Sequence, residues 1–129
     1  MSELIIETKN KKEIIDITEH INDLLKKEEK ETGLIFLFVL HTTCALTTAD
    51  LDPGAEKDYL TAFEEITPKK NFVHPHNPNH FSDHFLSSLV GTQLILPFKD
   101  KNLILGTWQR IILIEFNGPK KRNIYLKII

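Results

Sequence analysis

Apolar and polar residues follow one another along this chain in patterns that predict short strands and amphipathic helices. A short strand is expected at residues 3–8. Five aliphatic residues between Ile14 and Leu25 then recur at helical spacing, which predicts a helix ending near Gly33. The apolar run at 34–40 is too short for a typical buried helix and is rich in Phe, Ile and Val, so it predicts a buried strand.

The next segment, residues 41–48, is expected to continue as extended chain. Side chains alternate between the two faces of an extended segment, so His41 and Thr43 should lie on one face and Cys44 on the other. A nucleophilic dyad of Cys44 and His41 is therefore rejected, and Cys44 is interpreted as a small buried thiol.

Two more helices are expected in the middle of the chain. Asp52 followed by Pro53 is typical of a helix N-cap and a first-turn proline, and apolar residues at helical spacing follow them. Further along, prolines hold the chain extended until a helix can begin near Asn79 or Ser82, and Gly91 is its expected C-terminal stop.

The last third of the chain has the pattern of antiparallel strands. Strands are expected at 92–98 and at 102–116, with Gly106 as a bulge in the second. The Asn-Gly pair at 117–118 predicts a hairpin turn into a final strand at 121–129. This order of elements predicts an α+β fold.

Length and composition indicate an ordinary globular protein, and residues 1–129 are expected to form one domain. Sixteen Lys and Arg residues stand against eighteen Asp and Glu residues, so the net charge of −2 argues against nonspecific nucleic-acid binding. No apolar run is long enough to span a bilayer, and the N-terminus lacks a signal peptide's apolar core, so a cytoplasmic location away from membranes is expected.

The histidines are strongly clustered: four of the six lie in residues 74–84. On a helix, His80 and His84 are one turn apart and can reach one ion, with a third nitrogen from the preceding loop or from His41. Such a set would leave a position open for substrate, and zinc is the first candidate. The alternative is that these histidines are polar loop and cap residues bonded to the backbone.

Other residues could also carry chemistry. Asp50 and Asp52 could serve as metal ligands or as a general base, although the expected N-cap role already explains Asp52. Trp108 and Gln109 suit the binding of a flat ring, with core packing as the alternative for Trp108. The basic run at 120–122 could hold a phosphate, or it could be a solvated hairpin end.

Three segments together resemble the YjbQ-like family of small proteins: HTTCALTTADLDPG at 41–54, HPHNPNHFSDHFLSSLVG at 74–91 and GTWQRIILIEFNGPKKR at 106–122. The resemblance implies antiparallel sheets that form a sandwich-like core with about three helices. It also implies homo-oligomers, either trimers or larger rings. For some members it implies a weak thiamine-phosphate synthase activity.

The resemblance assigns the family's HTT motif to His41, Thr42 and Thr43, its loop histidine to His74 and its helix histidine to His84. His76 and His80 match a variant found in part of the family and form a second tier of metal ligands. This sequence lacks the longer stretch of the NEN type that other members carry before Asp52, which weakens the transfer of a role to Asp50.

Three functions follow as expectations. In a synthase, Mg²⁺ or another divalent ion would neutralise the diphosphate of a phosphorylated small-molecule substrate, with Arg110 or Lys120 near phosphate. In a hydrolase, a histidine-bound metal would activate water. A non-enzymatic oligomer would hold a metal or ligand at a subunit boundary. The residues expected to carry these roles are, for catalysis, His41, Asp50 and His84; for ligand or cofactor binding, Thr43, Trp108 and Gln109; for the metal, His41, His74 and His84, then His76 and His80.

Overall fold

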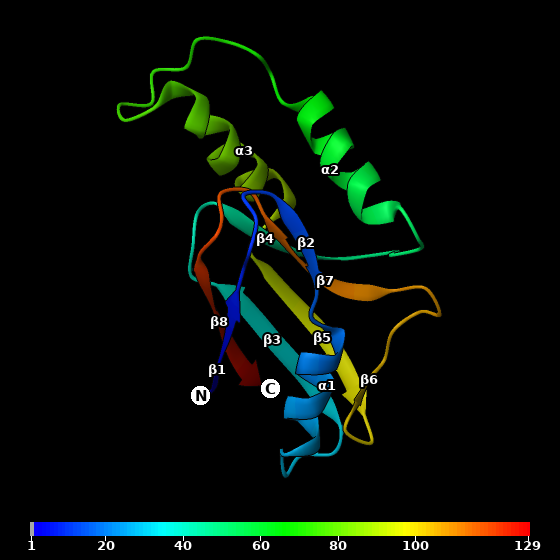
Figure 1. Ribbon diagram of the computed structural model, residues 1–129. Helices are drawn as coiled ribbons and strands as arrows, with labels where there is room; N and C mark the ends of the chain where they lie inside the picture. The colour runs from blue at the N-terminus through cyan, green and yellow to red at the C-terminus, as the bar shows by residue number, and fades with distance from the viewer. Residues whose placement is uncertain (1) are drawn as a thin grey trace.

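The computed structural model describes residues 2–129 and shows two antiparallel sheets with three helices (Figure 1). The larger sheet has the strand order β1 (Ser2–Glu7), β8 (Lys121–Ile128), β3 (Gly33–Val39), β5 (Gln93–Lys99) and β6 (Asn102–Leu103). The smaller sheet has the order β2 (Glu13–Asp16), β7 (Arg110–Glu115) and β4 (Cys44–Ala49). The helices are α1 (Thr18–Lys26), α2 (Ala55–Ile66) and α3 (Phe81–Val90), the last preceded by the 3-10 turn η1 (Pro78–His80). The expected α+β fold is confirmed.

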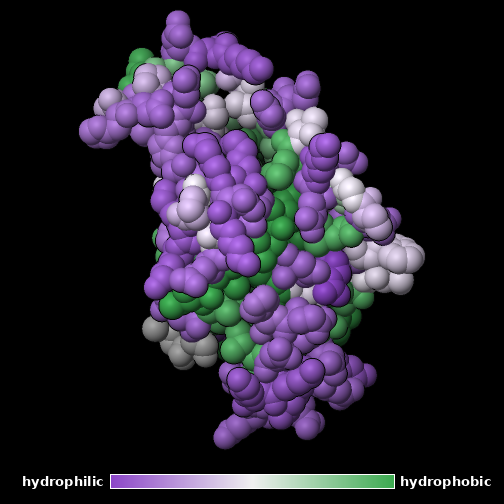
Figure 2. Space-filling view, viewed as in Figure 1, coloured by the Kyte–Doolittle hydropathy of each residue, from purple (hydrophilic) through white to green (hydrophobic). Residues whose placement is uncertain are grey.

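The main core lies between the two sheets and is closed by α1. Strand β7 shows why the smaller sheet is buried on both sides. Ile111 and Leu113 pack into the core between the sheets, whereas Ile112 and Ile114 pack beneath the other helices. Successive side chains of a strand point to opposite faces, so a strand that is apolar at every position must be buried on both faces. Figure 2 shows a band of hydrophobic residues across the middle of the molecule, over β2 and β1, while the helical region above it is mainly hydrophilic.

A second, smaller core lies between the outer face of the smaller sheet and the helices α2 and α3. Leu86 of α3 packs against Phe116, and Phe63 of α2 meets the Phe116 ring edge-on at 5.6 Å between ring centres. Helix α2 has no fully buried residue and packs against this core through one partly buried face. The space left between the two helices is the origin of the cavity described below.

The first helix is shorter than its apolar spacing predicts. Ile14 lies in β2, where it pairs with Ile114 of β7, and α1 begins only at Thr18. Asp16 ends the strand and accepts hydrogen bonds from the backbone N–H (3.0 Å) and the hydroxyl (2.7 Å) of Thr18. Strand pairing and this local bond to the first helical residue therefore overrode the helical period at Ile14.

The expected N-cap role of Asp52 is wrong. Helix α2 begins at Ala55 after Gly54, whose φ of 90° places it in the left-handed region, and no side chain caps the helix. The backbone carbonyl of Asp52, rather than its carboxylate, accepts the Ala55 N–H at 2.8 Å. A turn stabilised by glycine thus replaces the side-chain cap.

Residues 41–43 lie outside any strand, so the expected extended segment begins only at Cys44. Here the chain leaves β3 of the larger sheet and enters β4 of the smaller one. The expected long strand at 102–116 is also wrong. β6 ends at Leu103, and a loop follows in which the N–H of Gln109 donates to the carbonyl of Gly106 at 3.1 Å. Gly106 therefore lies in a turn rather than in a bulge.

The Asn-Gly pair at 117–118 does not form a hairpin, because β7 and β8 belong to different sheets. The chain crosses between the sheets at this point and passes very close to the end of β1. A Cβ on Gly118 would lie 2.2 Å from the carbonyl oxygen of Asn10 and 2.8 Å from the Thr8 hydroxyl. Glycine is needed here for close approach rather than for a tight turn.

Among the described residues 2–129, no helix combines the length and the apolar character needed to cross a bilayer.

Candidate functional site

Three histidine rings meet at the start of α3, and we call His74, His80 and His84 the histidine trio. His80 immediately precedes the first residue of α3 and His84 lies one turn later, so their rings share one face, with centres 4.7 Å apart. His74 comes from the loop between α2 and η1, and its ring centre lies 5.2 Å from that of His84 and 5.6 Å from that of His80. The loop and the helix together thus bring three imidazoles into contact.

Hydrogen bonds orient the two helical members of the histidine trio. Nδ1 of His80 lies 2.9 Å from a carboxylate oxygen of Asp83, and Nδ1 of His84 lies 3.1 Å from the backbone carbonyl of Thr42. Carbonyl and carboxylate oxygens accept, so Nδ1 of each ring is the donor. In the neutral form, each Nε2 then carries the lone pair that can accept a proton or bind a metal.

The third member, His74, has a nitrogen that no other group described in the chain binds. Its Nδ1 is buried and has no hydrogen-bond partner among the described residues. Burying a polar atom without a partner costs free energy, so such an atom in a folded protein calls for a ligand to satisfy it. The donor set of three imidazoles fits zinc or a similar divalent transition metal. As the rings stand, no group of three or more His, Cys, Asp or Glu side chains within residues 2–129 is positioned to hold an ion.

His41 immediately precedes Thr42, whose carbonyl contacts His84, but the ring of His41 is bonded to a different element. Nε2 of His41 accepts the backbone N–H of Asn123 in β8 at 2.9 Å. Burial, with a further contribution from the nearby Arg122 guanidinium, lowers the pKa of His41. The ring is therefore a neutral acceptor that ties the crossing segment at 41–43 to the larger sheet, and its Nε2 is already occupied. His76, the remaining loop histidine, is exposed.

Thr43 belongs to a buried polar network that sequence reasoning did not identify. Arg122 is 1% exposed and Glu115 is 0% exposed, and they form a bidentate ion pair in which Nε of Arg122 lies 2.8 Å from Glu115. Arg122 also donates to the hydroxyl of Thr43 at 2.8 Å, and Thr8 donates to Glu115 at 2.7 Å. The two expectations for the basic run at 120–122, a phosphate site or a solvated hairpin end, are therefore both wrong for Arg122.

The network also explains the ionisation of its members. Burial alone would raise the pKa of Glu115, but hydrogen bonds from Arg122, from Thr8 and from the backbone N–H of Asn117 outweigh it and hold the pKa below its ordinary value. Cys44 lies beside this pair in the main core, and burial raises the pKa of its thiol to about 12. Cys44 is therefore an unreactive core residue at neutral pH.

The remaining expected site residues lie at the opposite end of the smaller sheet. Strand β4 pairs Cys44 with Glu115 at one end and Ala49 with Arg110 at the other. Six residues of β4 span about 17 Å, at roughly 3.4 Å per residue, so Asp50 lies far from the histidine trio of the same chain. The structure thus separates the expected catalytic carboxylate from the expected metal ligands.

Trp108 and Gln109 lie at this far end as well. Trp108 is 71% exposed in the loop before β7, so it is not a core residue. The side chain of Gln109 accepts the N–H of Gly106 at 3.0 Å and donates to Thr48 at 3.1 Å, which uses both ends of its amide. Arg110 is held by Asp16 at 2.7 Å and by Glu19 at 3.5 Å. The far end is therefore an internally bonded polar cluster with one exposed ring.

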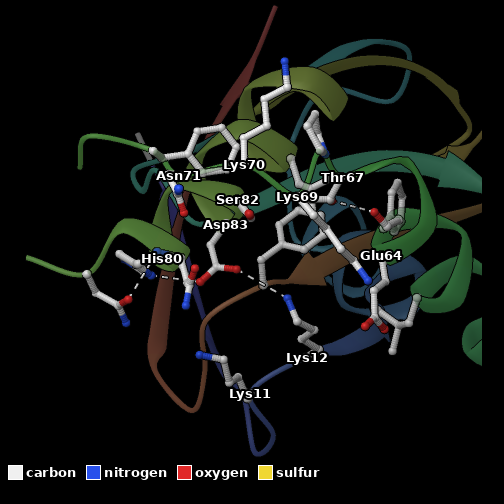
Figure 3. A pocket seen from close by; sticks show the side chains of 18 residues that line it. Lys11, Lys12, Glu64, Thr67, Lys69, Lys70, Asn71, His80, Ser82 and Asp83 are labelled. Atoms are coloured by element: carbon white, nitrogen blue, oxygen red, sulfur yellow. Dashed lines mark hydrogen bonds and ion pairs between the residues drawn. The ribbon is translucent and has the colours of Figure 1, made fainter.

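A cavity of about 660 Å³ lies beside the histidine trio, between α2, α3 and the segment that leads into β2 (Figure 3). Of the three histidines, His80 lines it, together with Asp83, which is 5% exposed. Asp83 also receives Lys12, whose Nζ lies 3.3 Å from its second carboxylate oxygen. Sequence reasoning missed Asp83, although its position three residues after His80, about one turn into the predicted helix, was a usable signal. Lys12 had no such signal, because its role depends on tertiary contact.

The comparisons with known proteins agree with this fold along its whole length. The family model described as "UPF0047 protein YjbQ-like" matches residues 2–129. The UPF0047 protein YugU of Bacillus subtilis is 34% identical, with 98% of this chain and 96% of the relative covered. A UPF0047 protein of Methanocaldococcus jannaschii is also 34% identical, with 96% and 90% covered.

Solved structures give the same result. The crystal structure of a protein of the yjbq/upf0047 family from Clostridium acetobutylicum has a TM-score of 0.89 and 30% identity, and all of both chains is covered. A YbjQ-like protein of unknown function from Sulfolobus solfataricus has a TM-score of 0.90 and 28% identity, with 98% of this chain and 94% of the other covered. The chain therefore belongs to the YjbQ-like UPF0047 family.

Proposed function

We propose that this protein binds one divalent transition metal ion through the histidine trio, with zinc as the first candidate. We further propose that it hydrolyses a small ester or amide at this site. The observation that carries the proposal is the spacing and hydrogen bonding of the three rings. Their centres lie 4.7–5.6 Å apart, the two helical rings each donate Nδ1 to an oxygen, and the buried Nδ1 of His74 lacks a partner. The rings would have to turn to bring three nitrogens onto one ion, because as they stand no three such side chains within residues 2–129 are positioned to hold one.

The surroundings of the rings support a catalytic site more than a structural one. A closed structural zinc site uses four protein ligands, whereas three histidines leave a fourth position for water or substrate. Asp83 and the Thr42 carbonyl act as the outer-shell partners that fix the tautomers of His80 and His84. A bound ion would supply Lewis acidity and a lowered pKa of bound water.

The chain's own residues also orient the proposed ligands. The buried carboxylate of Asp83 accepts the Nδ1–H of His80, which leaves the Nε2 lone pair of that ring for the ion. Both residues lie on the cavity wall, within reach of a ligand held there. Asp50, to which sequence reasoning gave the general-base role, is about 17 Å away along β4, at roughly 3.4 Å per residue, so it has no part in this site within one chain.

The geometry supports the synthase expectation less well than hydrolysis. The residues proposed to hold a ring and a phosphate in that reaction, Trp108, Gln109 and Arg110, lie at the far end of the smaller sheet from the histidine trio. Arg110 is engaged by Asp16 and Glu19, so its guanidinium is not free for a diphosphate. One chain does not assemble these parts around one substrate.

Assembly into a homo-oligomer, with the trimer as the first candidate, is also proposed. Ile5, Leu34 and Ile95 are 54%, 41% and 57% exposed, and they lie on the outer face of the larger sheet, because each alternates with a buried neighbour. Exposed aliphatic residues gathered on one sheet face are typical of a surface that another chain covers. Sedimentation equilibrium should show a trimer that Ile95→Glu weakens, and a wild-type monomer at micromolar concentration would refute this assembly.

The test of the metal site is elemental analysis by mass spectrometry of untagged protein purified without chelators. We expect about one zinc or other transition metal ion per chain, as three-histidine sites bind one ion. The variant His74→Ala/His84→Ala should lose it, while His20→Ala/His76→Ala, which removes two exposed histidines, should keep it. Circular dichroism checks that both variants fold. Folded wild-type protein that remains metal-free after incubation with zinc would refute the site.

A further inference from the structure

We propose that the 660 Å³ cavity beside the histidine trio is a binding site for a small amphipathic anion, with an acidic head held by lysines and a ring or other apolar body held between aromatic walls. This inference deepens the proposed function by naming its substrate class. It rests on that function only in calling the ligand a substrate, since the lysines and aromatic walls proposed to bind it are not metal ligands.

The size and shape of the cavity are those of a ligand site. Pockets for small molecules occupy about 300–1,000 Å³ and combine apolar walls with a few polar groups. Here the apolar wall is supplied by α2, by the loop after it, by α3 and by the residue after β7, through Leu60, Phe63, Phe72, Leu86 and Phe116. The three phenyl rings among them can pack against a planar or aliphatic body.

The charge of the lining selects an anion. Four lysines line the cavity against two acidic residues, Glu64 and Asp83, in a chain whose overall charge is negative. Lys11 and Lys12 come from the segment before β2, while Lys69 and Lys70 come from the loop after α2. Two segments far apart in the sequence therefore bring cations to one hollow, where their mutual repulsion would be relieved by an anionic ligand.

The individual lysines differ in how they are placed (Figure 3). Lys12 points toward Asp83 and lies 5.9 Å from the centre of the Phe116 ring, so its ammonium group lies where the polar and aromatic parts of the lining meet. Lys70 points away from the other labelled side chains and is the least suited to contact a ligand. Lys69 extends from the opposite wall toward Glu64 rather than away from the lining. Lys12 and Lys69 are therefore the residues on which binding of the acidic head should depend most.

The position of His80 connects this site to the proposed chemistry. His80 lines the cavity and belongs to the histidine trio, and Asp83 joins it to Lys12, so a ligand with its head near Lys12 lies beside one ring of the trio. Lysine acts as a point charge that binds phosphate or carboxylate without requiring a planar, bidentate partner. The ligand class therefore includes both aryl phosphates and aryl carboxylates.

The experiment is isothermal titration calorimetry of metal-free protein with three probes: phenyl phosphate, benzoate and methyl phosphate. We expect phenyl phosphate or benzoate to bind, and the one that binds identifies the acidic head. If phosphate is the head, phenyl phosphate should bind at least tenfold more tightly than methyl phosphate, on the order of the gain from burying a ring. If neither aryl probe binds at millimolar concentration, the proposal is overturned.

Variants test where the probe binds. Lys12→Ala/Lys69→Ala should weaken binding at least about tenfold, because each charged contact contributes on the order of a factor of ten. The matched control Lys26→Ala/Lys27→Ala removes two lysines at the end of α1, which is not part of the cavity, and should leave binding unchanged. Equal weakening in both would show only a general charge effect and would overturn the site. His74→Ala/His84→Ala should still bind the probe, so failure of the metal site and failure of the anion site are separable.

Discussion

Asp83 and His80 are hydrogen-bonded at 2.9 Å, between a carboxylate oxygen that is almost inaccessible to solvent and Nδ1 of a ring that lines the cavity. This contact lies between the two sites proposed for the protein. On one side, His80 belongs to the histidine trio. On the other, Asp83 receives Lys12 of the cavity. The same carboxylate therefore orients a ring of the proposed metal site and neutralises a lysine of the proposed anion site.

Asp83→Asn should weaken metal binding without unfolding the protein. Asn is nearly the same size as Asp, but its uncharged amide is a poorer acceptor for Nδ1 of His80. Loss of an outer-shell partner of a metal-binding histidine lowers metal affinity by about 10–100-fold. Zinc titration against a competing chelator measures the change, with Asp58→Asn on the exposed side of α2 as control. Equal affinities in wild type and Asp83→Asn would exclude a role for this contact.

Arg122→Met should be strongly destabilising, because it leaves the Glu115 carboxylate buried without its partner. Breaking a buried ion pair costs about 3–5 kcal/mol of unfolding free energy. The double variant Glu115→Gln/Arg122→Met should recover part of this loss, since no unpaired charge remains. The matched control is the neighbouring exposed pair of Lys121 and Glu7, at 3.7 Å, where Lys121→Met should cost only a few tenths of a kcal/mol. Urea unfolding measures the unfolding free energy of all three variants. Similar losses for Arg122→Met and Lys121→Met would contradict a special contribution of the buried pair to stability.

The same network predicts how stability depends on pH. The folded pKa of Glu115 lies below its ordinary value of 4.5, so ionised Glu115 stabilises the folded state. That stabilisation is complete above the unfolded value and is lost as the pH falls below about 4.5, toward the folded pKa. Asp16, whose pKa is lowered from 3.8, adds a loss in the same direction at still lower pH. Urea midpoints measured between neutral pH and about pH 3 should therefore fall, and fall less in Glu115→Gln. An equally steep fall in Glu115→Gln would show that groups other than Glu115 cause the loss of stability at low pH.

Cys44 should resist alkylation in the native protein. Its side chain is buried in the main core, and a thiol whose pKa is about 12 has almost no reactive thiolate at mildly alkaline pH. Iodoacetamide should leave the folded chain unmodified over a period in which the chain in concentrated guanidinium chloride reacts completely. Mass spectrometry of the intact chain measures both. Rapid alkylation without denaturant would mean that β4 opens or that the thiol is accessible.

Local patterns predicted most of the secondary structure, because they report which faces of an element must be buried. The apolar run at 34–40 and the alternation at the C-terminus correspond to β3 and β8, and the apolar face of residues 81–90 corresponds to α3. The patterns failed where a partner strand decided the outcome. Ile14 fits a helical period but pairs with β7, and the Asn-Gly pair at 117–118 fits a hairpin but joins two different sheets. Neither partner is visible to an analysis of neighbouring residues.

The candidate site was likewise predictable from the sequence only in part. The sequence by itself determined that His80 and His84 would share a helix face, since four residues are about one turn. It also determined the family, through motifs spread over the whole chain. Only the tertiary structure decided that His74 folds back onto this face, that His41 turns to β8, and that Asp50 lies at the other end of β4. The physical reason is that these contacts depend on which strands pair and where the chain crosses between sheets, and those are choices made by the whole core rather than by any one segment.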